Sequence, residues 1–465
     1  MEKRDVVVYS EDYKKLVDAA ALKDKYYEID ERVEEICKEA FKGCDKLEEI
    51  VMPKKLKKID SEAFQGCSSL TKLTLPDSVA RIDGLAFCGC SGLTELTLPN
   101  SVKSIGDGAF ADCSGLEKIT VESGNSRYDS RDNCNSIIET ATNTLIAGCK
   151  NSVIPNSVTS IGDSAFEGCT GLTELTLPKS VTSIGDGAFA YCSGLTELTL
   201  SNSLKCIEAY AFSGCRGITK LTLPNSVTSI GDSAFGGCSG LTELTLPSSI
   251  TSIGDCAFEG CSGMTELTLP SSITSIGWYA FQGCSGLTEL TLPNSITSIG
   301  EHAFSDCRGL TELTLPDSLK SIDGSVFSGC SSLTKLTLPN SLESIGEHAF
   351  SDCRGLTELT LPNSVASIGN GAFGGCSGLT ELTLPNSVTS IGDAAFSECS
   401  GLSKITSLAG IPPVFDRCMF VGEEFGEVNK ANCELIVPEE SITAYKQAKG
   451  WNEFSNIRGF VGEKK

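Results

Sequence analysis

Histidine and cysteine are the residues of this chain that could carry catalytic or metal chemistry. The two histidines, His302 and His348, occupy the same place in two near-identical segments that read Ile-Gly-Glu-His-Ala-Phe-Ser-Asp-Cys-Arg-Gly. The segments stand two periods of 23 residues apart, so strand spacing places the imidazoles about 10 Å from each other. Zinc needs its ligands at about 2.0–2.1 Å. We therefore predict structural or incidental surface histidines, and we expect no metal and no cofactor.

The cysteines follow a period of their own. Of the 23 in the chain, fifteen stand three positions after a Phe, from Cys44 to Cys399. On stacked repeats their Cα atoms would lie about 4.7–4.9 Å apart, but parallel Cβ vectors suit a disulfide poorly. We predict reduced thiols that pack as small apolar residues, with Cys149 as a further core position. Cys418 and Cys433 remain a candidate pair.

Motifs and composition exclude several classes of function. The chain shows no nucleophile–base constellation, phosphate loop or dinucleotide fingerprint, so we predict that it is not an enzyme. A net charge of −23 argues against nucleic acid as a partner, because phosphate binding needs a basic surface. No run approaches the roughly 18 apolar residues that would span a membrane. The apolar stretch in residues 1–9 is too short for a signal peptide.

A column of charged residues is the first candidate for binding. It comprises Glu49, Lys72, Glu95, Lys118, Glu174, Glu197, Lys220, Glu243, Glu266, Glu289, Glu312, Lys335, Glu358, Glu381 and Lys404. The run from Glu243 to Glu312 has no Lys to relieve the repulsion between like charges on neighbouring strands. A neighbouring column is almost all Thr. One interpretation is an acidic, hydroxyl-rich track for a basic or polar partner or a divalent cation. The other is a soluble face filled with a good strand former.

Positions where the repeats differ are further candidates. The two residues before Ala-Phe are usually Asp-Gly or Asp-Ser, but one repeat has Trp278-Tyr279, and His302 follows one repeat later. Exposed aromatic residues anchor interfaces, so these three could form a patch that binds a partner. Packing against the loop of the next repeat is the alternative. A second candidate patch lies in a longer repeat and comprises Arg127, Tyr128, Asp129, Arg131 and Asp132.

A repeat of 23 residues must position all these side chains. Fifteen phenylalanines mark it, at Phe41, Phe64, Phe87 and Phe110, and then every 23 residues from Phe166 to Phe396. In the unit 241–263, Leu244 and Leu246 alternate with polar residues, which predicts a strand with one buried face. Pro247 ends that strand because it has no amide proton to donate.

The second half of the unit predicts a turn or a short helix. Gly254-Asp255 opens it, and the Asp carboxylate can accept from free amides of its first turn. Ala257, Phe258 and Cys261 would then point inward. Gly263 suits a left-handed residue that closes the turn. No unit can cover its own apolar face, so the units must stack into a strand-rich solenoid of the α/β type.

The motif Leu-x-x-Leu-x-Leu-Pro followed by Ser-Ile-Gly-Asp-x-Ala-Phe-x-x-Cys closely resembles the BspA-like family of leucine-rich repeats. Segment 128–154 resembles the longer repeat found within such arrays, and the end from Val437 to Ile457 resembles their C-terminal cap. The resemblance implies a right-handed arc with a parallel concave sheet and with short turns or helices on the convex side. It covers about residues 31–457.

The ends of the chain complete the expected organisation. Residues 1–30 are predicted to form an N-terminal cap with a helix around residues 11–20, which shields the first repeat or binds a partner. Residues 31–407 form the solenoid, with the longer repeat at about 122–154. Residues 408–465 form a C-terminal cap in which Tyr445, Trp451 and Phe454 cover the last turn.

The resemblance also implies a function. The family is a scaffold associated with surface adhesion and partner binding, so we expect a non-enzymatic, monomeric binding protein at the cell surface or secreted. Its partner would be a protein, such as a host or extracellular-matrix protein. The alternative is a cytoplasmic sensor or assembly scaffold that recognises a protein partner, which the missing signal peptide and the reduced cysteines favour.

Overall fold

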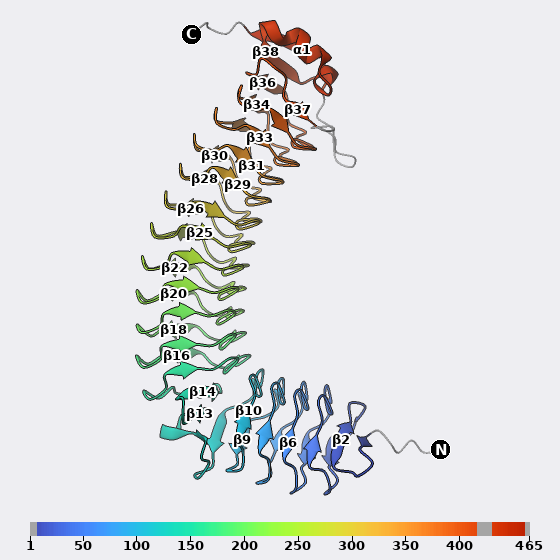
Figure 1. The fold of residues 1–465 in the computed structure, drawn as a ribbon, viewed down its shortest axis with the longest axis vertical. Helices are drawn as coiled ribbons and strands as arrows, with labels where there is room; N and C mark the ends of the chain where they lie inside the picture. The colour runs from blue at the N-terminus through green and yellow to red at the C-terminus, as the bar shows by residue number, and fades with distance from the viewer. Residues whose placement is uncertain (1–6, 416–429, 461–465) are drawn as a thin grey trace, which may run out of the picture. The chain divides into compact units, whose positions relative to one another are not determined.

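The computed structural model describes residues 7–415 and 430–460. Strands and turns dominate these residues, and they divide into two compact units that we describe separately. The N-terminal unit comprises residues 7–227, and the C-terminal unit comprises residues 228–415 and 430–460. Within each unit, successive repeats stack as turns of a parallel β-solenoid (Figure 1). The predicted strand-rich solenoid is therefore confirmed.

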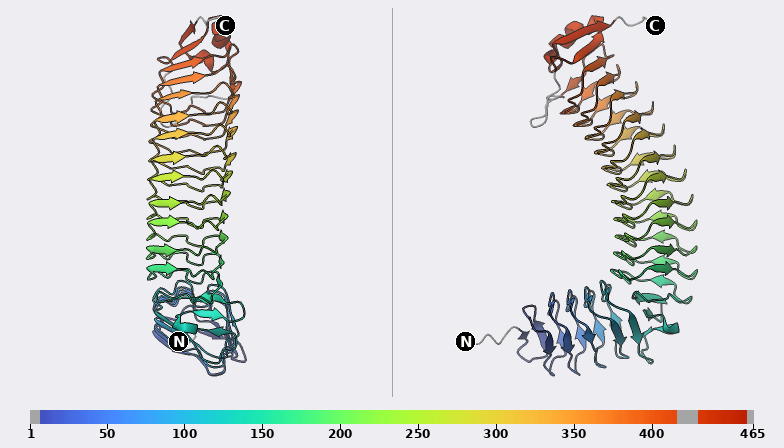
Figure 2. Two further views of the ribbon diagram at one scale, coloured as in Figure 1. Left: turned by 90° about the vertical axis from the view of Figure 1, so that its left-hand side faces the viewer. Right: turned by 180° about the vertical axis from the view of Figure 1, so that it is seen from behind.

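Each repeat of the C-terminal unit contributes two short strands, which belong to two kinds of sheet on different sides of the repeat. The strands that begin with Glu or Lys are β22 (Glu243–Thr245), β24 (Glu266–Thr268), β26 (Glu289–Thr291), β28 (Glu312–Thr314), β30 (Lys335–Thr337), β32 (Glu358–Thr360), β34 (Glu381–Leu384) and β36 (Lys404–Ser407). The strands of the second sheet are β21 (Ser229–Ile230), β23 (Ser252–Ile253), β25 (Ser275–Ile276), β27 (Ser298–Ile299), β29 (Ser321–Ile322), β31 (Ser344–Ile345), β33 (Ser367–Ile368), β35 (Ser390–Ile391) and β37 (Val414–Phe415). Figure 2 shows these strands stacked one above another.

The N-terminal unit follows the same plan. The strands of the first kind of sheet are β3 (Tyr26–Glu28), β5 (Glu49–Val51), β7 (Lys72–Leu73), β9 (Glu95–Leu98), β11 (Lys118–Val121), β16 (Glu174–Thr176), β18 (Glu197–Thr199) and β20 (Lys220–Thr222). The strands of the second kind are β2 (Lys15–Asp18), β4 (Glu35–Ile36), β6 (Lys58–Ile59), β8 (Arg81–Ile82), β10 (Ser104–Ile105), β15 (Ser160–Ile161), β17 (Ser183–Ile184) and β19 (Cys206–Ile207). Neighbours pair in parallel at a constant register, as Glu95 does with Lys118.

The longer repeat departs from this plan. Its strands β12 (Tyr128–Asp129), β13 (Ile137–Glu139) and β14 (Thr144–Ala147) pair in antiparallel fashion, with a 3-10 turn η1 (Arg131–Asn133) between the first two. The strand β14 then rejoins the parallel sheet through β15. Gly148 is required here, because a side chain at this position would collide with the ring of Phe166. Cys149 is buried, as the sequence predicted.

The 23-residue repeats share a core of stacked phenylalanine rings, and the longer repeat has no Phe of its own. Ring centroids of successive residues, such as Phe258 and Phe281, lie 5.4 Å apart with an angle of 4° between the planes. Between Phe41 and Phe110, the centroids of successive rings lie 4.9–5.6 Å apart. Burying each side chain contributes roughly 1.5–3 kcal/mol. The solenoid therefore depends on contacts that exist only between neighbouring repeats.

The cysteine column has a role that the sequence did not reveal. The Cys284 thiol donates a hydrogen bond to the carbonyl oxygen of Phe258, one repeat back, with Sγ and O 3.3 Å apart. The same bond joins Cys90 to Phe64 and Cys353 to Phe327. A small apolar residue would fill this space, but it would leave the carbonyl without that donor. The thiols thus tie each Phe turn to the preceding one.

The Phe turn is a backbone ladder and not a helix. The amides of Gly371, Phe373 and Gly375 donate to the carbonyls of Asp393, Ala395 and Ser397 on the next repeat. Two residues of each turn adopt positive φ, one two positions before the Phe and one two positions after it. In the unit 241–263 these are Cys256 (φ 54°) and Gly260 (φ 68°). The alternation lets every second amide of the turn point toward the next repeat.

Two details of the predicted turn were therefore wrong. Gly263 is not the left-handed residue. It is a glycine because a Cβ there would press on the backbone carbonyls of Ser239 and Leu241, one repeat back. The Asp255 carboxylate does not accept from its own turn, because it accepts the amide of Trp278 on the next repeat. Both residues serve the contact between repeats.

The predicted helix at residues 11–20 was also wrong. Residues 15–18 form the strand β2, which pairs in antiparallel fashion with β1 (Val8–Tyr9) and in parallel with β4. Leu16 lies in register with Ile36 and is fully buried, whereas Val17 is exposed. The helical spacing of apolar residues misled because the open edge of the next turn offers the backbone more hydrogen bonds than an isolated helix would.

The C-terminal end closes with two strands and short helices. The strands β38 (Glu434–Pro438) and β39 (Asn456–Phe460) extend the sheet beyond β36. Between them lie η2 (Glu439–Ser441), α1 (Ile442–Gln447) and η3 (Trp451–Glu453). Trp451 is fully buried, and its indole N–H donates to the carbonyl of Pro413. Cys433 is buried, whereas Cys418, its candidate partner, lies outside the described residues.

Candidate binding surfaces

The first candidate surface is the outward face of the strands that begin with Glu or Lys. In β24 and β26, Leu267 and Leu290 point into the core, and the residues on either side of each Leu are exposed. In-register parallel pairing places Glu266 directly beside Glu289. The period of two along a strand and the constant register between strands therefore collect the carboxylates into one column. The predicted column is confirmed as a structural feature.

The charges along this column are only partly balanced. The Nζ of Lys335 lies 2.9 Å from a carboxylate oxygen of Glu312, and that of Lys404 lies 3.0 Å from Glu381. Glu266 and Glu289, in contrast, have Glu on the strands at both sides. Neighbouring like charges on a sheet destabilise it. Glu266 and Glu289, inside the stretch Glu243–Glu312, thus keep like charges on both sides, whereas Glu312 at its end is paired with Lys335.

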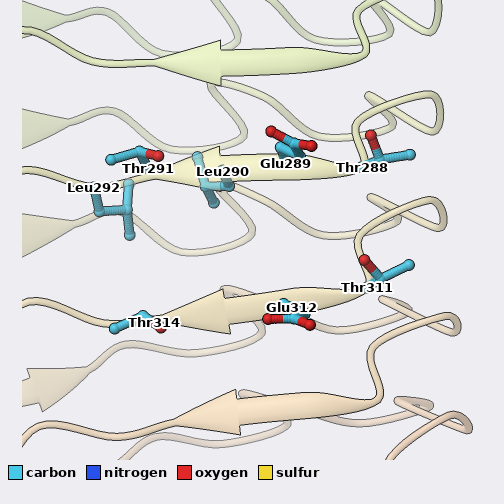
Figure 3. Close-up of a pocket in the computed structure, with 8 residues that line it drawn as sticks. All are labelled: Thr288, Glu289, Leu290, Thr291, Leu292, Thr311, Glu312 and Thr314. Carbon is cyan, nitrogen blue, oxygen red and sulfur yellow. The ribbon is translucent and has the colours of Figure 1, made fainter.

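A shallow hollow lies at the end of this stretch. It has a volume of about 500 Å³. The residues that line it are Thr288, Glu289, Leu290, Thr291, Leu292, Thr311, Glu312 and Thr314 (Figure 3). The carboxylates of Glu289 and Glu312 lie one above the other on neighbouring strands. The hollow offers acceptors and hydroxyls, which suit a cationic or polar ligand group.

One of the threonine columns has a structural task. The hydroxyl of Thr288 donates to the carbonyl of Thr265, one repeat back, over 3.1 Å. The same carbonyl also accepts the amide of Thr288. A second column repeats the pattern, with the Thr297 hydroxyl donating to Thr274. These hydroxyls are used within the fold, so they supply less to a partner than their number suggests.

The second candidate surface is the aromatic cluster, by which we mean Trp278, Tyr279 and His302. The side chain of Trp278 is 58% exposed. The rings of Tyr279 and His302 stack with centroids 4.7 Å apart and an angle of 4° between the planes. The structure therefore brings Tyr279 and His302 of neighbouring repeats together. This stacking is compatible with both predicted roles, a patch that binds a partner and packing against the next repeat.

The aromatic cluster costs the fold stability. Tyr279 and His302 adopt φ values of 57° and 59°, at a position that other repeats fill with residues as different as Gly, Ser, Glu and Tyr. A bulky residue with positive φ is strained by roughly 1–3 kcal/mol. Trp278 stands where Asp232 and Asp255 each accept an amide of the following repeat. An indole cannot accept that amide, and losing such a cap costs about 1 kcal/mol.

The patch predicted in the longer repeat is largely used by the fold. Tyr128 is only 3% exposed, and its hydroxyl accepts the amide of Ile105. Arg127 pairs with Glu139 at 2.9 Å, and Arg131 pairs with Asp129 at 2.7 Å. Tyr128 as a surface contact was therefore wrong.

The structure adds a surface that sequence reasoning missed. A hollow of about 460 Å³ is lined by Asp306, Arg308, Ser328, Gly329, Ser331, Asp352 and Arg354. Arg308 and Arg354 each pair with the Asp two positions earlier, at 3.1 and 2.9 Å. The two identical segments that contain His302 and His348 also contain these pairs, and that repetition was the available signal.

The thiols are not poised for chemistry. Burial raises the pKa of Cys284 and Cys330 to about 12. The partly exposed Cys256 lies in the column of Tyr279, and burial together with Glu259 raises its pKa to about 11. A raised pKa keeps the thiol protonated and unreactive at neutral pH.

The described residues also bear on metal binding and on membrane-spanning helices. In residues 7–415 and 430–460, no group of three or more His, Cys, Asp or Glu side chains is arranged to hold a metal ion. No helix in this part of the chain has the length and apolar character needed to cross a membrane.

The family follows from this repeat geometry together with sequence comparison. The family model described as "BspA type Leucine rich repeat region (6 copies)" matches residues 22–138, 145–265, 206–334, 259–377 and 320–419. The chain belongs to the BspA-type leucine-rich-repeat family. Leucine-rich-repeat proteins of this kind are generally protein-interaction modules. The sequence search found no match among curated proteins.

Similar proteins are also found among solved structures. A leucine-rich repeat protein from Bacteroides ovatus is 29% identical to this chain and has a TM-score of 0.53. The match covers 87% of this chain and 91% of the other. A leucine rich cell surface protein from Faecalibacterium prausnitzii is 27% identical, with 71% of this chain and 83% of the other covered and a TM-score of 0.42.

Proposed function

We propose that this BspA-type chain is a non-enzymatic, monomeric protein-binding module that acts in adhesion at the cell surface or after secretion. The partner would be a protein, such as a host or extracellular-matrix protein. The observation that carries the proposal is the aromatic cluster, which exposes an indole beside a half-buried, stacked Tyr–His pair at a cost to the fold. A family of interaction modules gives that cost a purpose, because exposed aromatic residues supply binding energy.

The outward Glu face extends the proposed surface. Glu243, Glu266, Glu289 and Glu312 would supply charge complementarity, which steers a partner and fixes its register more than it adds affinity. Arg127 and Arg131 are weaker candidates, because both side chains already form ion pairs within the longer repeat. The end segments, residues 7–30 and 430–460, would act as caps of a right-handed solenoid.

The experiment is partner capture with two matched double variants. Trp278→Ala with Tyr279→Ala removes the aromatic cluster. Tyr191→Ala with Tyr210→Ala removes two tyrosines on turns of the N-terminal unit that are 56% and 54% exposed. We expect the first pair to lose a captured partner and the second to retain it. Equal capture by both would remove the aromatic cluster from the proposal.

A cytoplasmic scaffold that recognises a protein partner is the second candidate function. It is supported by the cysteine column, whose buried thiols donate hydrogen bonds and need no oxidising compartment. Fractionation of the native cells separates the two candidates. Protein confined to the cytosol would defeat the adhesive function, and protein on the surface or in the medium would defeat the scaffold.

A further inference from the structure

Trp278 interrupts a ladder of carboxylate caps. In the column that it occupies, the Asp232 carboxylate accepts the Asp255 amide at 2.9 Å, and the Asp255 carboxylate accepts the Trp278 amide at 2.8 Å. Further along, the Asn370 side chain accepts the Asp393 amide in the same way. The fold therefore favours a short acceptor at residue 278. A large indole there breaks a local rule and leaves the residue 58% exposed, which is typical of a functional position.

The neighbouring column departs from its own rule at the same place. Tyr279 and His302 occupy left-handed positions that suit Gly or Ser. Their rings stack on each other, and this stacking offsets part of the backbone strain. A Cβ at Gly300 would collide with the indole of Trp278 and with the backbone of residues 277 and 278. The indole thus lies against the backbone of the next repeat, and Trp278 remains 58% exposed.

The surroundings of the aromatic cluster are negative. No Lys or Arg occurs between Lys220 and Arg308, whereas this stretch contains eight Asp and Glu residues. Asp255 and Glu301 flank Trp278 on the adjacent repeats, and both are exposed. An open aromatic face between two carboxylates attracts a cation by two additive effects, the ring quadrupole and the Coulomb interaction.

We propose that the aromatic cluster binds an arginine-bearing, basic segment of a protein partner. The guanidinium would stack on the Trp278 indole and pair with Asp255 and Glu301. Arginine fits better than lysine because its planar group stacks on aromatic faces and donates to carboxylates in a fixed geometry. The inference rests on the proposed function and adds the chemistry of the partner. Nucleic acid is disfavoured because its phosphates would meet these carboxylates.

The test uses labelled peptides and the full chain. The probe is a short Gly-Ser peptide that carries several arginines, and its two controls carry lysine or neutral citrulline at the same positions. Fluorescence anisotropy of the labelled peptide gives the affinity. We expect the arginine peptide to bind at least about tenfold more tightly than the citrulline peptide. Binding should weaken as ionic strength rises.

Trp278 also provides an intrinsic signal. The other tryptophan, Trp451, is fully buried, so quenching by iodide reports on Trp278 alone. We expect the arginine peptide to protect Trp278 from iodide, with the same midpoint as the anisotropy titration. Unchanged quenching at saturating peptide would place the bound peptide elsewhere and overturn the inference.

The matched variants keep the fold intact. Trp278→Asp restores the carboxylate ladder and should abolish binding while leaving the protein as stable as before or more so. Asp255→Asn keeps the oxygen that caps the amide of residue 278 but removes the charge, and it should weaken binding severalfold. Glu358→Gln removes an equally exposed carboxylate from the strand face and should change nothing. Undiminished binding to Trp278→Asp, or equal affinity for arginine and citrulline peptides, would overturn the inference.

Failure of the inference is distinguishable from failure of the proposed function. If partner capture depends on Trp278 and Tyr279 but the arginine peptide shows no preference, the proposed function stands and the basic segment is wrong. If the peptide binds through Trp278 but capture of a protein partner does not depend on it, the cation site stands and the proposed role of the aromatic cluster in partner binding fails.

Discussion

The repeats of residues 14–121 and those of the C-terminal unit use one backbone and different links between side chains. Lys57 in the first group forms an ion pair with Glu34, one repeat back. At the same place in the C-terminal unit, the Thr297 hydroxyl donates to the carbonyl of Thr274. The backbone bond is the same in both regions, because the Lys57 amide donates to the carbonyl of Glu34 and the Thr297 amide donates to that of Thr274.

This difference teaches which part of the repeat is free to change. The backbone ladder, the Phe stack and the thiol bonds recur in both regions, so they hold the fold. The outward columns tolerate either ion pairs or hydroxyls. In residues 14–121 the acidic side chains are largely paired with Lys, whereas in the C-terminal unit Glu266 and Glu289 stand beside other Glu residues. Negative charge that could contact a partner therefore lies in the C-terminal unit, around Glu266 and Glu289.

The largest expected effect is alkaline unfolding, which both regions should share. Burial raises the pKa of Cys284, Cys330 and Cys399 from 9.0 to about 12. Because the folded pKa is raised, this stabilisation is complete below pH 9 and is lost as pH rises toward 12. Urea unfolding should show a free energy that falls steeply above pH 9. Cys284→Ala should make that slope shallower, and a flat profile between pH 9 and 11 would contradict the prediction.

Truncating a stacked ring comes next. Phe281→Ala should destabilise the C-terminal unit by about 3–5 kcal/mol, through lost burial and the cavity left between two neighbouring rings. Phe87→Ala should do the same to the N-terminal unit, because the stack is common to both. Hydrogen exchange read by mass spectrometry localises each loss. Losses that differ by more than about 2 kcal/mol would show that the regions do not share one core.

Removing a partly buried cation should affect one of the two regions and not the other. Lys58 is only 30% exposed and lies near Glu35, Asp60 and Asp83. Lys58→Met should destabilise residues 14–121 by about 1 kcal/mol, and the loss should shrink in high salt because screening already weakens the interaction. The Lys15 ion pair lowers the pKa of Glu35, so stability here is present above pH 4.5 and lost in more acidic solution. A loss that salt does not change would contradict an ionic origin.

The smallest expected effect tests the hydroxyl link. Thr288→Val keeps the shape and strand propensity of the side chain but removes its donor to Thr265. We expect a loss of about 0.5 kcal/mol, because the bond is exposed to water. Urea unfolding in low and high salt should give the same loss. A salt-dependent loss would show that the hydroxyl bonds of the C-terminal unit and the ion pairs of residues 14–121 do not differ in the way proposed.

Particular residues show how far sequence reasoning reached. Phe258 and Cys261 were placed in the core from period alone, and the column of Glu266 and Glu289 was placed on the surface in the same way. Tyr279 and His302 were predicted to share a patch or to pack on the next repeat, and only the structure shows that their rings stack. Tyr128 and the segment 11–20 were wrong, because at the irregular repeats there is no column of equivalent residues from which to read the buried side.

The amino-acid sequence alone determined the period, the inward columns and the outward charges of this protein. A repeat of constant length forces equivalent residues into columns, and apolar columns must face each other. Only the tertiary structure decided which carbonyl each thiol meets, where the backbone turns left-handed, and that Asp255 caps a neighbouring repeat. These depend on where the next turn of backbone places its donors and acceptors, and no residue carries that information by itself.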